Sequence, residues 1–248
     1  MVTCKLYGRM GNQMFQIAAT IALALRNNDS YAIPAGSKKP DLWPRYFHFP
    51  RKLMHVKSIW QESSHSYTAI PYSDGLCLDG YFQSEKYFSD YRKEIIEAVG
   101  LHWAKWNGIV SVHVRRGDYV NLQEKHPPVT VEYLREAMAT IENYPSVSPL
   151  NGEKPRSPFQ FLFFSDDIEW CRRNFPGNWY SENRTELDDL MMMSCCEHNI
   201  IANSSFSWWG AWLNRNADKV VIAPKVWFGP KNAHLDTKNL IPDTWIKI

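Results

Sequence analysis

Short apolar runs alternate along this chain with segments in which apolar residues recur every three or four positions. Short apolar runs bounded by turns are typical of buried strands, and the longer spacing is typical of helices packed on one side. Strands that alternate with helices form parallel sheets with crossover helices, so the pattern predicts an α/β fold. The predicted strands are 2–6, 109–113, 159–164 and 199–202, and the predicted helices are 14–25, 130–143, 168–175, 185–198 and one that begins near Trp208.

Length and charge limit the possible functions. The 248 residues, 44% of them hydrophobic, are enough for one large domain or two compact lobes. The 28 Lys and Arg against 26 Asp and Glu give a net charge of +2, which argues against a protein that binds nucleic acid through a basic excess. Any anion site must therefore be local. No apolar run approaches the ~18 residues that a membrane-spanning helix needs.

The cysteines and the N-terminal run indicate the compartment. Five cysteines are an odd number without the spacing of metal ligands, and Cys195 lies beside Cys196, which is poor geometry for a structural disulfide. This pattern indicates a reducing compartment and no structural zinc. The run at 2–6 lacks the basic lead, long apolar segment and cleavage site of a secretory signal. We therefore expect a cytoplasmic protein without stable membrane insertion.

Two arginines follow the predicted strand 109–113. Strand alternation places His113 and Arg115 on the same face, and Gly117 ends the element. A guanidinium binds phosphate oxygens through two parallel hydrogen bonds and stays charged at any working pH, so Arg115 and Arg116 suit a diphosphate. The alternative is that one of these arginines only forms an ion pair with Asp118.

Polar residues also follow the next two predicted strands. Asp166 and Asp167 come after 159–164, where open α/β sheets place ligands, although capping of the following helix is the more common role and a metal site is a weaker interpretation. Ser204 and Ser205 precede the helix near Trp208, where hydroxyls and backbone amides form an anion site. Phe206 offers a ring to a base. Three strand ends thus predict one anion site on one edge of the sheet.

Two other segments carry weaker indications. The loop 8–13 lacks the spacing of the known phosphate-binding loops, but Asn12 and Gln13 offer amides at a helix start and its glycines allow close approach to a ligand. The region 29–91 has poor periodicity and predicts irregular structure with short strands, which could hold an acceptor surface. The proline-rich segment 145–158 predicts a surface loop.

Four motifs give the chain a recognisable pattern: GRMGNQMFQ at 8–16, HVRRGDY at 113–119, FSDD at 164–167 and NSSFSWWG at 203–210. With DGYFQ at 79–83 and IAPK at 222–225, the chain resembles glycosyltransferase family 11, the α-1,2-fucosyltransferases. The resemblance implies a GT-B-like fold of two Rossmann-like lobes, a GDP-fucose donor, inversion at the anomeric carbon, and no metal or other cofactor. It divides the chain into an acceptor-side lobe at 1–104 and a GDP-sugar-binding lobe at 105–248.

The resemblance also implies roles for single residues. Arg115 would hold the donor β-phosphate, with Arg116 as a second cation or structural partner. The other donor-binding expectations are His113 on the nucleoside side, Asp166 or Asp167 on guanine or ribose, and Ser204, Ser205 and the amide of Phe206 on phosphate oxygens. The loop with Arg9, Asn12 and Gln13 resembles that of protein O-fucosyltransferases and would orient the acceptor hydroxyl or the leaving phosphate. The general base would be either Asp118 or the leaving phosphate itself.

The expected reaction moves L-fucose to the 2-hydroxyl of a galactose-terminated oligosaccharide or lipid-linked glycan. Transfer to another hydroxyl, or of a related GDP-deoxysugar, is the alternative within enzymes. A non-catalytic glycan-binding module, using some of the 11 Trp and 12 Tyr as platforms for sugar rings, is the alternative outside enzymes. That module would leave the three anion-suited strand ends without a role.

Overall fold

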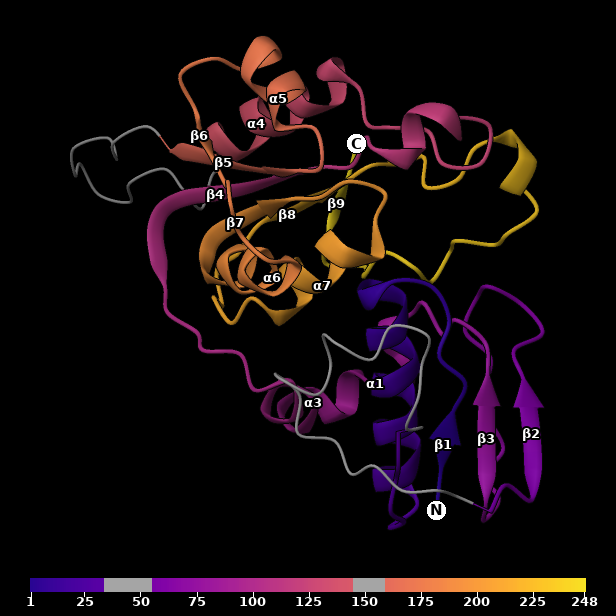
Figure 1. The fold of residues 1–248 in the computed structure, drawn as a ribbon. Helices are drawn as coiled ribbons and strands as arrows, with labels where there is room; N and C mark the ends of the chain where they lie inside the picture. Colours follow the sequence, from indigo (N-terminus) through magenta and orange to yellow (C-terminus); the bar gives the residue numbers. More distant parts are fainter. Residues whose placement is uncertain (34–54, 145–158) are drawn as a thin grey trace. The chain divides into compact units, whose positions relative to one another are not determined.

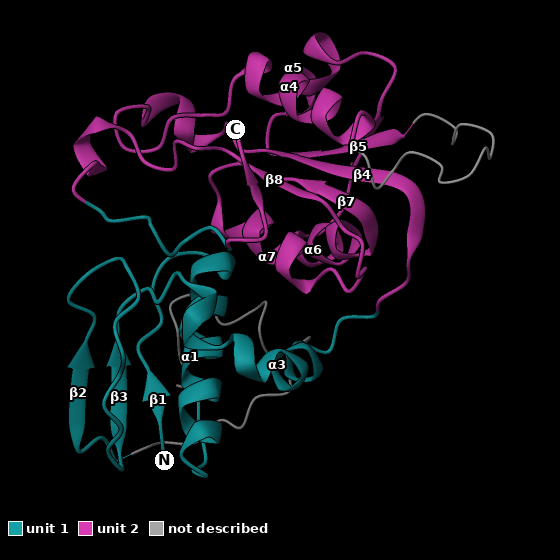
Figure 2. Ribbon diagram, turned by 180° about the vertical axis from the view of Figure 1, so that it is seen from behind, with its two compact units in different colours: residues 1–102, 235–242 teal, residues 103–234, 243–248 magenta. Residues whose placement is uncertain are grey.

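The computed structural model describes residues 1–33, 55–144 and 159–248. The described chain divides into unit 1, residues 1–102 with 235–242, and unit 2, residues 103–234 with 243–248 (Figure 2). The sequence-based division placed everything after 104 in one lobe, whereas the segment 235–242 groups with unit 1. The predicted loop at 145–158 lies outside the described residues.

Unit 1 contains a parallel three-stranded sheet in the order β1-β3-β2 (Figure 1). The helix α1 packs against β1 and against α3, and most of its residues are buried, including the polar Gln13, Gln16 and Thr20. Two of the strands and two 3-10 turns fall in the region whose sequence predicted irregular structure. The elements are β1 (Thr3–Cys4), α1 (Met10–Arg26), β2 (Ser58–Gln61), β3 (Leu76–Asp79), η1 (Glu85–Tyr87), η2 (Ser89–Tyr91) and α3 (Arg92–Val99).

Unit 2 is built on a parallel sheet in the order β6-β5-β4-β7-β8-β9. Helices α4 and α5 cover one face, and α6 and α7 cover the other (Figure 1). The strands are β4 (Trp106–Val114), β5 (Gln160–Ser165), β6 (Trp179–Tyr180), β7 (Cys196–Ile200), β8 (Val221–Ala223) and β9 (Ile246–Lys247). The helices are α4 (Val131–Glu142), α5 (Ile168–Asn174), α6 (Glu186–Cys195) and α7 (Ser205–Leu213), with 3-10 turns η3 (Asp118–Asn121) and η5 (Pro230–Asn232).

From Val110 to Val114, strand β4 is buried on both faces, as expected of a central strand in a doubly covered parallel sheet. Val110, Val112 and Val114 lie in the core beneath α4 and α5. Ser111 and His113 point to the opposite face and are also buried. The Ser111 hydroxyl accepts a hydrogen bond from Asn199 Nδ2 on β7 at 2.6 Å, which satisfies a polar group inside the sheet.

The helix predicted at 130–143 is confirmed, with Thr130 as its N-cap and the Thr130 hydroxyl accepting from the backbone N–H of Tyr133. The boundary predicted between 198 and 199 is wrong, because α6 ends at Cys195 and β7 begins at Cys196. The helix passes directly into extended backbone at Cys196, without a glycine or proline to mark the change. All five cysteines are buried and none is in a disulfide.

Candidate active site

The carboxyl ends of β4 and β5 lie side by side in unit 2. The strands pair in parallel with Val114 opposite Ser165, so the residues that follow each strand meet at the same edge. Arg115 Nη1 lies 2.7 Å from Asp166 Oδ2. The carboxylate of Asp166 also accepts the backbone N–H of Arg116 at 2.8 Å through Oδ1. One carboxylate thus connects the turn after β4 to the turn after β5.

Gly117 makes this contact possible because it lacks a side chain. A Cβ added at this position would lie 2.4 Å from Asp166 Oδ2, closer than such atoms approach in proteins. Any larger residue would displace the carboxylate or the turn. The glycine of the HVRRGDY motif therefore allows the Asp166 carboxylate to approach this turn closely.

Each arginine has a carboxylate and an aromatic partner. Arg115 Nη2 donates to Asp118 Oδ1 at 2.5 Å, and its guanidinium carbon lies 5.5 Å from the centre of the Tyr119 ring. The ion pair weighed in the sequence is present, and Asp166 adds a second one. The guanidinium is held in place by these contacts, yet the Arg115 side chain remains 18% exposed and accessible to a ligand.

Arg116 is held against α5. Its Nε lies 3.1 Å from Asp167 Oδ2, and its guanidinium carbon lies 4.3 Å from the centre of the Trp170 ring. The other oxygen of Asp167 accepts the backbone N–H of Trp170 at 3.1 Å, so Asp167 is the N-cap of α5. The capping role that the sequence favoured is thus present, and the same side chain also fixes a cation.

His113 lies on the face of β4 that α7 covers. Its ring centre is 5.6 Å from that of Phe206, and the side chain is almost fully buried. Burial lowers the pKa of His113 to about 4, against the opposing charge of Asp166 and with a further lowering by Arg115. The imidazole is therefore neutral near pH 7. Its Nδ1 is buried and has no hydrogen-bond partner among the described residues.

Ser204 and Phe206 stand at the start of α7. The Ser204 hydroxyl is the N-cap and accepts the backbone N–H of Phe206 at 3.3 Å. Two of the three groups predicted to hold phosphate oxygens thus bond to each other in this structure, and the third, Ser205, is the first residue of the helix. Trp208, Trp209 and Trp212 pack on one another and are buried.

Sequence reasoning assigned no role to Tyr119 and Asn203. The Tyr119 hydroxyl donates to the backbone carbonyl of Asn203 at 3.3 Å, and its ring stacks on His126. Asn203 Nδ2 donates to the carbonyls of Pro127 and Trp227. These contacts connect the turn after β4 with the loop before α7. Tyr119 lies in the HVRRGDY motif and Asn203 in the NSSFSWWG motif. Their place in these motifs was the one signal in the sequence that could have identified them.

The loop predicted to meet the acceptor, residues 8–13, lies in unit 1. Arg9 occupies the N-cap position of α1. Asn12 Oδ1 accepts from Gln83 Nε2 at 2.8 Å, and Gln13 Nε2 donates to the backbone carbonyl of Gly8 at 3.1 Å. Gln83 belongs to the DGYFQ motif but was given no role from the sequence. Its contact shows that this motif holds the first loop.

Within residues 1–33, 55–144 and 159–248, no group of three or more His, Cys, Asp or Glu side chains is arranged to hold a metal ion. None of the helices in the described part of the chain is long and apolar enough to cross a membrane. The positive charges at the joined ends of β4 and β5 are those of Arg115 and Arg116, beside the carboxylates of Asp118, Asp166 and Asp167.

A known family matches most of the chain. Residues 37–248, which include the whole of unit 2, match the model described as "Glycosyl transferase family 11". The chain belongs to glycosyl transferase family 11. The resemblance identified from the four motifs is confirmed, and this family 11 protein is a member of a family of sugar-transferring enzymes.

Curated relatives agree with this assignment. The O-antigen biosynthesis glycosyltransferase WbnK of Escherichia coli is 31% identical over 200 residues, which span 71% of this chain and 61% of WbnK. An alpha-1,2-colitosyltransferase of Escherichia coli is 28% identical over 100% of this chain and 98% of that protein. Galactoside alpha-(1,2)-fucosyltransferase 2 of Oryctolagus cuniculus is 26% identical over 90% of this chain and 69% of that protein.

Solved structures match in fold. The NodZ alpha-1,6-fucosyltransferase from Bradyrhizobium, co-crystallised with GDP, has a TM-score of 0.50 at 14% identity, covering 84% of this chain and 90% of NodZ. Arabidopsis thaliana FUT1 in complex with GDP also has a TM-score of 0.50, at 10% identity, covering 97% of this chain and 74% of FUT1. The α/β fold with two Rossmann-like units, of the GT-B type, is confirmed.

Proposed function

We propose that this protein is an inverting, metal-independent galactoside 2-α-L-fucosyltransferase that uses GDP-β-L-fucose. The observation that carries the proposal is the fixed guanidinium of Arg115, held by Asp118 and Asp166 at the carboxyl end of a central parallel strand in a family 11 protein. Open α/β sheets bind ligands at this edge. The natural acceptor is proposed to be a galactose-terminated oligosaccharide or lipid-linked glycan.

The chemistry of a GDP leaving group suits such a guanidinium. As the anomeric bond stretches, negative charge grows on the β-phosphate and the sugar becomes oxocarbenium-like. A cation already fixed at the oxygen stabilises this transition state more than the ground state. In this proposal the phosphate oxygens accept from the N–H groups of Arg115 that Asp118 and Asp166 do not use, and Arg116 supplies the second positive charge.

The nucleoside would lie beside His113 and Phe206. A neutral imidazole offers a donor and an acceptor to a base, and an aromatic ring offers a stacking surface. Asp166 or Asp167 would bind guanine or ribose. Phosphate oxygens would bind at the start of α7, to the hydroxyls of Ser204 and Ser205 and the backbone N–H of Phe206. The N-terminus of a helix is well suited to bind an anion.

The proton of the attacking hydroxyl has two possible acceptors in this proposal. Asp118 is close to the reacting phosphate, but its carboxylate is engaged by Arg115. The leaving phosphate is the other acceptor and needs no protein base. Asn12, with Arg9 and Gln13, would orient the acceptor hydroxyl or the leaving group from unit 1, which we propose as the acceptor side.

A second candidate is transfer of another deoxysugar from its GDP conjugate. The relative that covers this whole chain at 28% identity is named for the transfer of colitose, whereas the relatives named for fucose align with about two thirds of their own length. We rank fucose first because the four sequence motifs resemble those of the α-1,2-fucosyltransferases. We further propose a cytoplasmic location, and the five unpaired cysteines are compatible with a reducing compartment.

The test is GDP release in metal-free buffer with GDP-fucose, with and without lactose, followed by linkage analysis of the product. The proposal predicts lactose-dependent release and an α-1,2-fucosylated galactose. A parallel reaction with GDP-colitose measures donor choice. Faster turnover of GDP-colitose would favour the second candidate. Glycan binding without GDP binding would support the non-catalytic module instead.

A further inference from the structure

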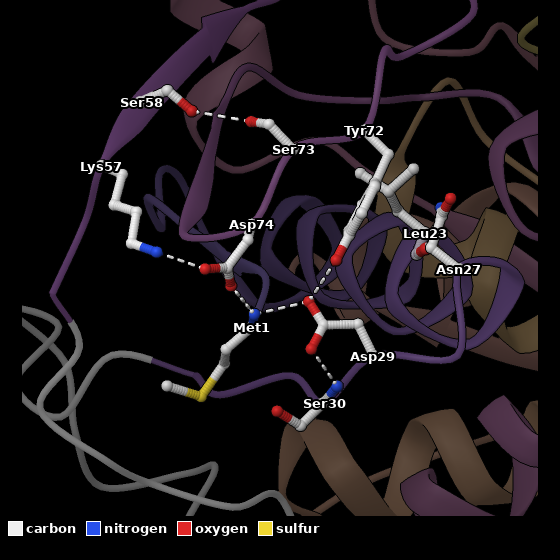
Figure 3. A network of polar contacts seen from close by, with 10 residues as sticks. All are labelled: Met1, Leu23, Asn27, Asp29, Ser30, Lys57, Ser58, Tyr72, Ser73 and Asp74. Atoms are coloured by element: carbon white, nitrogen blue, oxygen red, sulfur yellow. Dashed lines mark hydrogen bonds and ion pairs between the residues drawn. The ribbon is translucent and has the colours of Figure 1, made fainter.

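The two ends of the unit 1 sheet are built differently. At the end where the strands begin, charged groups pair with one another (Figure 3). The amino group of Met1 lies 2.5 Å from Asp29 and 2.8 Å from Asp74, and Lys57 forms an ion pair with Asp74. The Tyr72 hydroxyl donates to Asp29 at 3.0 Å. This network fixes the segments around this end of the sheet.

At the opposite end, two tyrosines stand beside a carboxylate. Tyr7, after β1, and Tyr81, after β3, have ring centres 6.3 Å apart and are 38% and 44% exposed. Asp79 accepts the Tyr7 hydroxyl at 2.9 Å through Oδ1 and pairs with Lys5 Nζ at 2.7 Å through Oδ2. Solvent-facing aromatic rings thus lie next to groups that bond to hydroxyls.

The backbone that presents Tyr81 is strained. Phe82 has a φ of +54°, a conformation that is a genuine outlier for a bulky residue and costs free energy. Its ring is fully buried and packs near Trp60 and edge-on against Tyr87. The Glu62 carboxylate accepts the backbone N–H of Tyr81 at 2.7 Å and that of Phe82 at 3.1 Å. The turn that carries the exposed Tyr81 is therefore held in a conformation that costs free energy.

The same turn is tied to the loop already proposed to meet the acceptor. Gln83 follows Phe82, is almost fully buried, and donates from Nε2 to Asn12 Oδ1 at 2.8 Å. Gln16, also buried, accepts the backbone N–H of Tyr7 at 2.9 Å. Both tyrosines are thus carried by segments whose positions are fixed by buried amides.

We propose that Tyr7, Tyr81 and Asp79 form the binding subsite for a sugar ring of the acceptor glycan. The C–H face of a pyranose packs against the tyrosine rings, and its hydroxyls bond to the Asp79 carboxylate and the Lys5 ammonium. Ligand sites typically combine aromatic surface with a few fixed polar groups, and the two tyrosines with Asp79 and Lys5 provide both. The inference rests on the proposed function, since it names where that enzyme holds its acceptor.

Steady-state kinetics of Tyr81→Ala, with Tyr81→Phe and Tyr72→Ala as controls, tests the subsite. Tyr81→Ala should raise the KM for lactose by about 2- to 10-fold, the loss typical of an aromatic contact, and leave the KM for GDP-fucose unchanged. Tyr81→Phe keeps the platform and should behave as wild type. Tyr72→Ala removes a tyrosine of similar exposure at the other end of the sheet and should leave both KM values unchanged. An unchanged lactose KM in Tyr81→Ala would overturn the subsite.

Saturation-transfer NMR with lactose and no donor separates this inference from the proposed function. Lactose should give a signal with the wild-type protein and lose it with Tyr81→Ala or Tyr7→Ala. This result would support the subsite even where wild-type protein transfers no fucose, an outcome that would refute only the function. Fucose transfer to lactose together with an NMR signal that survives both substitutions would refute only the subsite.

Discussion

The guanidinium of Arg115 and the carboxylate of Asp166 form an ion pair, with 2.7 Å between Nη1 and Oδ2. The two residues follow adjacent parallel strands, and Gly117 allows their turns to approach this closely. A partly buried cation is thereby held in one orientation before any ligand arrives. Preorganised charge of this kind is the main means by which enzymes stabilise developing negative charge.

Gly117→Ala should break this arrangement. The added methyl group would meet the Asp166 carboxylate, so we expect the free energy of unfolding to fall by about 1–3 kcal/mol and kcat/KM to fall by about 10-fold. The control is the same substitution in an Asp166→Ala background, where the clashing group is absent. There it should cost little more than Asp166→Ala alone. Equal costs in both backgrounds, measured by denaturant unfolding, would show that the contact with Asp166 is not the cause.

Asp118→Asn tests the general base. Because Asp118 is engaged by Arg115, we expect the amide to weaken the positioning of the guanidinium and to lower kcat by less than about 10-fold. The pH profile of kcat should keep the shape of the wild-type profile. A drop of about 100-fold or more, together with loss of an acid limb that the wild type shows, would make Asp118 the base.

His113 should make the stability of the protein depend on pH. Its pKa is about 4 in the folded protein against an ordinary 6.5, so the unfolded chain binds the proton more tightly between these values. Stability therefore falls as the pH drops from 6.5 toward 4, by up to about 3 kcal/mol for this group. The free energy of unfolding of His113→Asn should show a correspondingly smaller decrease over that range. Parallel curves for the variant and the wild type would contradict the burial argument.

Chelation tests the proposed independence from metal. After exhaustive treatment with EDTA, we expect the rate of GDP release with GDP-fucose and lactose to stay within about twofold of the untreated rate, because guanidinium charge serves the leaving group. Added magnesium or manganese should change it little. Loss of activity that either metal restores would require Asp166 and Asp167 to be reconsidered as metal ligands.

The local features of unit 2 were predictable from the sequence. The strand ends that carry Arg115, Asp166 and Ser204 each follow a short apolar run, and the cap at Thr130 follows from its hydroxyl before an apolar stripe. Parallel pairing then brings the residues after β4 and β5 to one edge, as the alternation of strands and helices required. These predictions depend on periodicity over a few residues, which a single sequence contains.

The features that were missed depend on contacts between residues distant in sequence, or on changes of backbone conformation that no glycine or proline marks. The boundary between α6 and β7 at Cys195 has no turn residue, so periodicity could not locate it. The left-handed Phe82 is stabilised by Glu62 across the sheet, and neither residue type predicts such a conformation. The pairing of Tyr7 with Tyr81 requires β1 and β3 to be neighbours, which the sequence did not establish.

The most direct test of the account is the kcat/KM for GDP-fucose of Arg115→Ala and Arg115→Lys, each checked for wild-type secondary structure and thermal stability. Arg115→Ala should lose on the order of 100-fold or more, as expected when a donor to a developing oxyanion is removed. Arg115→Lys should recover little, because the planar fork that bonds to two oxygens is lost. A folded Arg115→Ala protein with near-normal turnover would contradict the account.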